Sequence, residues 1–155
     1  MTGFTLTVFT AVHVALSLVG IASGAVAILG FLRRQPIPFW NGLFLWTTAI
    51  ASLTGFFFPY SGVTPGIVVG VVCLLALAVA AFALRGEKPR TYITVVCFAE
   101  SLNVIVLITQ LFEKVPTLHS YAPTGHESIV AIIQLMSLLL FIVLAWVSIK
   151  RRRKE

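Results

Sequence analysis

The stretch VVCFAESLNVIVLITQLF, from Val95 to Phe112, decides the fold class. Its apolar residues continue over about five helical turns, and a single charged side chain, Glu100, interrupts them. A run of about 20 such residues is what an α-helix needs to cross the ~30 Å hydrocarbon core of a bilayer. The stretch therefore predicts a membrane-spanning helix that carries a carboxyl group inside it.

Similar apolar runs fill the rest of the chain, in which 59% of the 155 residues are hydrophobic and 10% are charged. These runs are continuous rather than alternating, which excludes a closed β-barrel. The pattern predicts an all-α integral membrane bundle that occupies residues 1–155 as one transmembrane helical domain. Its five expected spans are residues 5–32, 39–58, 65–84, 92–112 and 128–149.

The basic residues predict the orientation of this bundle. Ten of the eleven Lys and Arg residues lie in segments that five alternating spans place on one side, and Lys114 is the exception. Because cytoplasmic segments are enriched in Lys and Arg, we expect the N-terminus outside and the C-terminus in the cytoplasm.

The formal net charge of +6 does not predict nucleic-acid binding. The basic segment KRRRKE, residues 150–155, directly follows an apolar span, which is typical of a segment that contacts anionic lipid headgroups. The expected partners are therefore the bilayer and its anionic headgroups, with no nucleic acid. Cys73 and Cys97 lie in different spans without a CxxC motif, which favours small core residues over a redox pair.

The first span carries a stripe of small and polar residues on one face. Successive helical residues are 100° apart, so His13, Ser17, Gly20, Gly24 and Ala27 share one side. Small residues at such spacings allow helices to approach closely in lipid. Thr48 and Ser52 in the second span and Cys73 in the third repeat the pattern, which predicts packing seams.

Glu100 belongs to a polar face on the fourth span, together with Asn103 and Gln110. A charge at the bilayer centre costs at least ~2.5 kcal/mol, so we expect Glu100 to be protonated or paired. Depth counted at 1.5 Å per residue places His13 within about 6 Å of its level, which predicts a buried titrating pair of His13 and Glu100. Asn103, Gln110 and Gln134 are the expected supporting hydrogen-bonding residues. The alternative is a purely structural hydrogen bond between two helices.

The long outer segment EKVPTLHSYAPTGHE, residues 113–127, supplies His119, His126 and Glu127 as candidates for a polar outer mouth. Imidazole and carboxylate ligands suit Zn, Cu or Fe, but the spacing of His119 and His126 matches no compact zinc pattern. Heme ligation by His13 and His119 is a further alternative. The most economical expectation is that the protein holds no cofactor.

Motifs for enzymatic catalysis are absent from the sequence. It contains no Asp, no Gly-rich phosphate loop, no nucleophile elbow and no HExxH motif. We therefore expect a protein that is not an enzyme.

Four segments together carry a resemblance: HVALSLVGIASG, LFLWTTAIASLTGFFFP, NVIVLITQLFEKVPTLHSYAPT and the following Glu127. The chain resembles a group of small bacterial multi-span membrane proteins of unknown function. The likeness covers most of the chain, and it places His13, Asn103, Gln110, His119 and Glu127 on shared positions. The resemblance implies a bacterial cytoplasmic (inner) membrane location and implies no activity.

Three functions are compatible with these features. The first is a polar bundle interior that binds or conducts a proton, a small ion or a small polar solute. The second is a membrane redox component that binds heme, metal or quinone through His13 and His119. The third is an accessory subunit of a larger membrane complex, and homo-oligomers are a further expectation because small-residue faces allow helices to associate.

Overall fold

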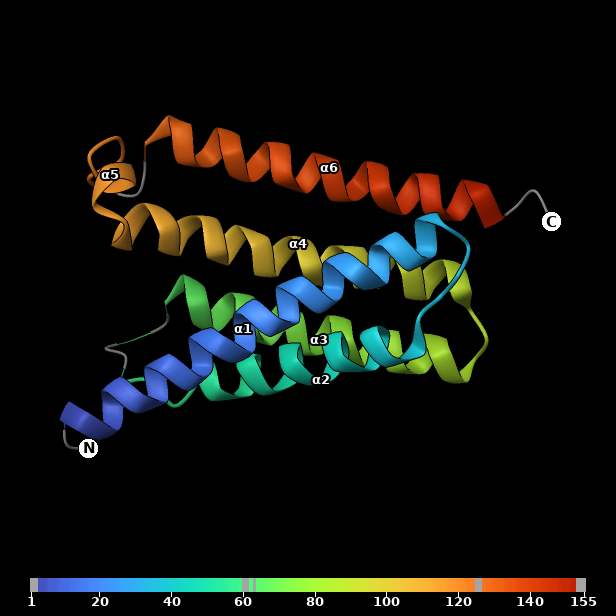
Figure 1. The fold of residues 1–155 in the computed structure, drawn as a ribbon, viewed down its shortest axis with the longest axis horizontal. Coiled ribbons are helices and arrows are strands. Elements are labelled where there is room, and N and C mark those ends of the chain that lie inside the picture. The colour runs from blue at the N-terminus through green and yellow to red at the C-terminus, as the bar shows by residue number, and fades with distance from the viewer. Residues whose placement is uncertain (1–2, 60–61, 63, 125–126, 153–155) are drawn as a thin grey trace.

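A computed structural model describes residues 3–59, 62, 64–124 and 127–152. Throughout these residues the regular structure is helical, without strands. In Figure 1 the long helices run side by side in alternating directions, and short loops join successive helices at the two ends. The helices are α1 (Gly3–Leu32), α2 (Pro38–Gly55), α3 (Pro65–Arg85), α4 (Pro89–Lys114), α5 (Pro116–His119) and α6 (Ser128–Arg152).

Four of these helices, α1, α3, α4 and α6, are long and apolar enough to cross a membrane. The chain is therefore a multi-pass membrane protein whose apolar side chains contact the bilayer. The expected second span corresponds to α2, which has 18 residues and is not among the four. Its hydropathy is lowered by Pro38, Asn41 and three threonines.

Proline sets where three of the helices begin. Pro38, Pro65 and Pro89 each occupy the first turn of a helix, where a fixed φ and a missing N–H carry no penalty. The expected fourth span therefore begins three residues earlier than predicted, at Pro89. The second ends three residues earlier, at Gly55, where the N–H groups of Phe56 and Phe57 donate to Leu53 O and Thr54 O and so close the last turn.

The main core lies between α1, α2, α3, α4 and α6. Small residues recur on α3 in this core, where Ala76, Ala80 and Ala83 are buried. On α1, a side chain at Gly20 would lie 3.2 Å from Thr47 Oγ1 of α2. These contacts confirm the predicted seam on the first span, because only small residues permit such an approach.

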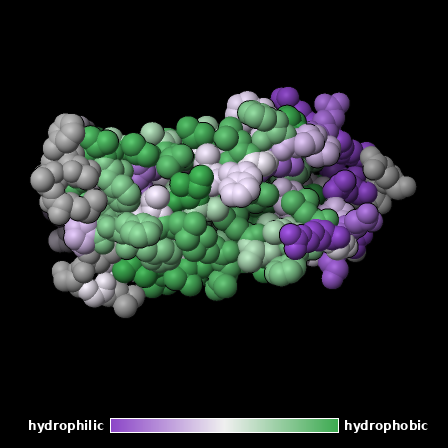
Figure 2. Space-filling view, turned by 90° about the horizontal axis from the view of Figure 1, so that it is seen from below, coloured by the Kyte–Doolittle hydropathy of each residue, from purple (hydrophilic) through white to green (hydrophobic). Residues whose placement is uncertain are grey.

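Figure 2 shows hydrophilic residues concentrated at one end of the molecule and a hydrophobic belt along its length. The basic residues at the end of α1, between α3 and α4, and at the end of α6 belong to this hydrophilic end. Lys114 ends α4, which finishes at the opposite end of the bundle in Figure 1.

Candidate functional site

Glu100 lies in the interior of the bundle with 1% of its surface exposed. It projects from α4 toward α1, where Gly24 has no side chain. A Cβ atom at Gly24 would lie 2.6 Å from Glu100 Cδ and 2.8 Å from Phe44 Cδ2 of α2. The carboxyl group thus occupies the volume that the glycine leaves vacant.

The surroundings of this carboxyl group come from three helices. Asn103, one turn further along α4, lies beside it. The amide Nδ2 of Asn103 donates to Thr48 Oγ1 of α2 at 3.1 Å. Cys73 of α3 and Cys97 of α4 lie within electrostatic reach of Glu100. We call Glu100, Asn103, Thr48, Cys73 and Cys97 the Glu100 cluster.

Both cysteines are buried and free, which agrees with their predicted role as small core residues. The side chain of Ser52 on α2 lies near the Cys73 thiol. A buried thiol is a weak donor and behaves as a small hydrophobic group. The two cysteines therefore supply volume around Glu100 and no positive charge.

The Glu100 carboxyl group lacks a complete set of partners. Its Oε2 atom is buried and has no hydrogen-bond partner among the described residues. An ionised carboxylate in such a place loses its hydration without the compensation of a cation. Burial of this kind favours a neutral carboxylic acid over a carboxylate.

The structure does not bring His13 and Glu100 together as a pair. His13 Nδ1 lies 2.9 Å from Thr54 Oγ1 of α2, and its ring packs edge-on against Phe58 with centroids 5.1 Å apart. Thr54 Oγ1 also lies 2.8 Å from Ile50 O within α2.

Helix length explains the separation of this pair. The depth estimate placed the start of the first span, residue 5, at the outer edge of the membrane. However, α1 has 30 residues, and at about 45 Å it is longer than the ~30 Å hydrocarbon core. Glu100 contacts α1 at Gly24, which is about 16 Å further along the helix than His13.

The three supporting residues have three different environments. Asn103 belongs to the Glu100 cluster, as described above. Gln134 of α6 donates from Nε2 to Thr109 Oγ1 of α4 at 2.9 Å, so it joins two helices. Gln110 is exposed and donates to Glu113 Oε2 at 3.2 Å within α4.

The outer-mouth candidates lie around α5 and the start of α6. His119 is exposed, and its Nδ1 is 3.3 Å from Phe112 O. Glu127 Oε1 accepts bonds from Thr124 N at 2.9 Å and Thr124 Oγ1 at 3.0 Å. His126 falls outside the described residues.

Within residues 3–59, 62, 64–124 and 127–152, no group of three His, Cys, Asp or Glu side chains lies close enough together to bind a metal ion. His13 and His119, the proposed heme or metal ligands, each have a different partner, Thr54 and the Phe112 carbonyl.

Sequence reasoning assigned Glu100 and Asn103 to the site but did not include Gly24, Phe44 or Thr48. Helical periodicity did single out Gly24 and Thr48, because each lies on a helix face made of small or polar residues. Periodicity identifies a face without identifying the helix that it meets, so these residues were assigned to packing. Phe44 carries no such signal.

Comparison with known proteins finds no matching family model, no matching curated protein and no matching solved structure. The functional inference therefore depends on the arrangement of side chains in this chain.

Proposed function

We propose that the protein is a five-span bundle that binds or conducts a proton, alone or with a small ion or polar solute, with Glu100 as the proton-binding group. The observation that carries this proposal is the buried carboxyl group whose Oε2 atom has no hydrogen-bond partner in the part of the chain that the structure describes. Ionisable residues inside membrane spans are costly and are retained mainly on ion and proton pathways.

Five spans are favoured by the course of α2. It lies beside α1, as the bond between His13 and Thr54 requires, and runs along the bundle in Figure 1. Phe39 and Trp46 of α2 are 69% and 72% exposed, which suits contact with lipid. An odd number of spans, with the basic end in the cytoplasm, places the N-terminus outside.

Access from the outer side is supported by a series of interhelical hydrogen bonds on that side of Glu100. These are the bonds from Asn103 to Thr48 and from Gln134 to Thr109. The amides and hydroxyls in these bonds are polar groups that a proton or a small polar solute could contact in succession. The resemblance noted above favours the bacterial inner membrane as the location.

The test is proton flux into proteoliposomes that contain the purified chain alone. We expect Glu100→Gln to fold like the wild type, because it keeps shape and neutrality, and to lose the pH-driven flux. Glu113→Gln is the matched control, since it removes an exposed carboxylate of the same helix, and its flux should equal that of the wild type.

Equal flux in the wild type and Glu100→Gln would contradict the proposal. No flux from the wild-type chain alone would exclude conduction by this chain alone, and would favour an accessory subunit that works only in a larger complex.

A further inference from the structure

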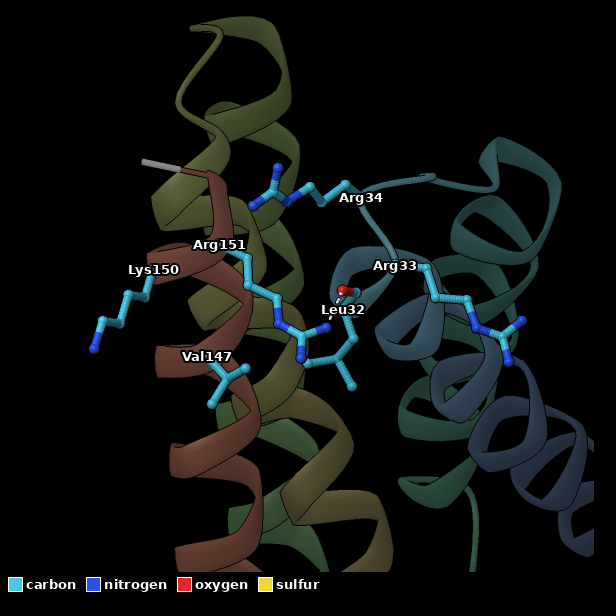
Figure 3. A pocket seen from close by; sticks show the side chains of 6 residues that line it. All are labelled: Leu32, Arg33, Arg34, Val147, Lys150 and Arg151. Atoms are coloured by element: carbon cyan, nitrogen blue, oxygen red, sulfur yellow. Dashed lines mark hydrogen bonds between the residues drawn. The ribbon is translucent and has the colours of Figure 1, made fainter. Parts of the chain in front are cut away.

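A basic groove lies between the ends of α1 and α6, away from the Glu100 cluster. It has a volume of about 460 Å³. Figure 3 shows the side chains of Arg34 and Arg151 extending into the space between these ends, with Arg33 and Lys150 on opposite flanks. The lining residues are Leu32, Arg33, Arg34, Val147, Lys150 and Arg151.

Among the described residues, the charged side chains that line this groove are all basic. They come from two helix ends that are more than 100 residues apart in sequence, and within residues 3–59, 62, 64–124 and 127–152 no carboxylate lines the groove. Glu87, an acidic residue of the loop between α3 and α4, lines a separate hollow with Lys88 and Arg152. Clustered cations with low-dielectric walls concentrate anions from solution.

Arg151 holds the two sides of the groove in place. Its Nη1 donates to Leu32 O at 2.8 Å, which satisfies a carbonyl at the C-terminal end of α1. A guanidinium has five N–H donors in a planar fork, so this bond leaves donors for a second acceptor. Arg34 follows α1 with a φ of 59°, and this left-handed turn directs the chain across the helix end.

The groove combines this charge with apolar surface. Leu32 and Val147 line it, and Lys150 Nζ lies 4.7 Å from the ring centroid of Trp146. Tryptophan and basic residues at the end of an apolar span are typical of the depth of lipid headgroups. A ligand that fits both features has a phosphate and an adjoining hydrocarbon chain.

We propose that this groove binds the phosphate of an anionic phospholipid headgroup, with Arg34 and Arg151 as its principal contacts and the acyl chain against Leu32 and Val147. The inference is independent of the proposed function, because it uses no residue of the Glu100 cluster. Basic pockets between transmembrane helices on the cytoplasmic side bind headgroups of this class.

Native mass spectrometry of the full chain tests the proposal. The protein is exchanged into mixed micelles of equal phosphatidylglycerol and phosphatidylcholine, and the ratio of the two bound lipids is measured. We expect the wild type to retain phosphatidylglycerol preferentially. Removal of one arginine should weaken this preference roughly five-fold, since each juxtamembrane basic residue contributes on the order of 1 kcal/mol.

The variants separate the groove from general basic charge. Arg34→Gln with Arg151→Gln should abolish the preference, whereas Arg85→Gln with Arg90→Gln, which removes the same charge at the same end, should preserve it. Arg34→Gln alone keeps the bond from Arg151 to Leu32, so it should fold and weaken the lipid preference roughly five-fold. This variant tests the proposal even if the double variant fails to fold.

Three outcomes would overturn the proposal. An equal loss of phosphatidylglycerol preference in the two double variants would show an effect of charge alone. A preference that is unchanged in Arg34→Gln would show that the groove does not bind the lipid. Displacement of the lipid by inorganic phosphate at matched ionic strength would assign the groove to free phosphate.

Discussion

Gly24 of α1 and Glu100 of α4 are in close contact in the core, and this contact is possible because Gly24 has no Cβ atom. Inward orientation of both residues was predictable from helical periodicity. Their contact was not, because periodicity does not encode which helix faces which. The predicted pairing of His13 with Glu100 failed to form for the same reason, since α1 presents Gly24 at the level of the carboxyl group.

We expect Gly24→Ala to destabilise the protein by about 1–3 kcal/mol, because the new methyl group would overlap Glu100 and Phe44. Thermal unfolding in detergent measures the change. Gly42→Ala is the control, because no atom of the described residues outside its own helical backbone lies within 4 Å of a Cβ there and alanine improves helix propensity. Equal stability of the two variants would refute the close fit at Gly24.

At the scale of elements, helices are held together by threonines that accept bonds from amides on neighbouring helices. The boundaries of the helices were predictable within about three residues from proline and apolar run length. The partners of the threonines were not, because a hydroxyl that bonds within its own helix has the same sequence signal as one that bonds to another helix.

Thr48→Val should lower the free energy of unfolding by about 0.5–1.7 kcal/mol, because the Asn103 amide loses its acceptor on α2. Thr94→Val is the matched control: its exposed hydroxyl donates to Arg90 O within α4 at 3.0 Å. Unfolding in bicelles gives both values, and a Thr48→Val protein as stable as Thr94→Val would show that the interhelical bond contributes nothing.

The whole molecule has one basic end and a hydrophobic belt, as hydropathy and charge predicted. Loop lengths allow neighbouring helices to be antiparallel, so the alternation in Figure 1 was also predictable. The position of α6, which packs mainly on α4, was not, since one apolar helix face resembles another in composition.

Reporter fusions at the two termini should give opposite locations, with the N-terminal reporter outside and the C-terminal reporter in the cytoplasm. Opposite locations require an odd number of spans, and hence that α2 crosses the membrane. Removal of the basic residues at the end of α6 is the informative control, because Arg33, Arg34 and Arg85 should still keep the orientation. Both reporters on one side would reduce the count to four.

The central claim is that Glu100 carries a proton inside the membrane, and infrared spectroscopy of the reconstituted protein at neutral pH tests it most directly. All five acidic residues of the chain are glutamates, so few carboxyl groups contribute to the spectrum. We predict a carbonyl band of a protonated carboxylic acid in the wild type that persists in Glu113→Gln and disappears in Glu100→Gln. Identical spectra of the wild type and Glu100→Gln in this region would contradict the account, because Glu100 would then be ionised.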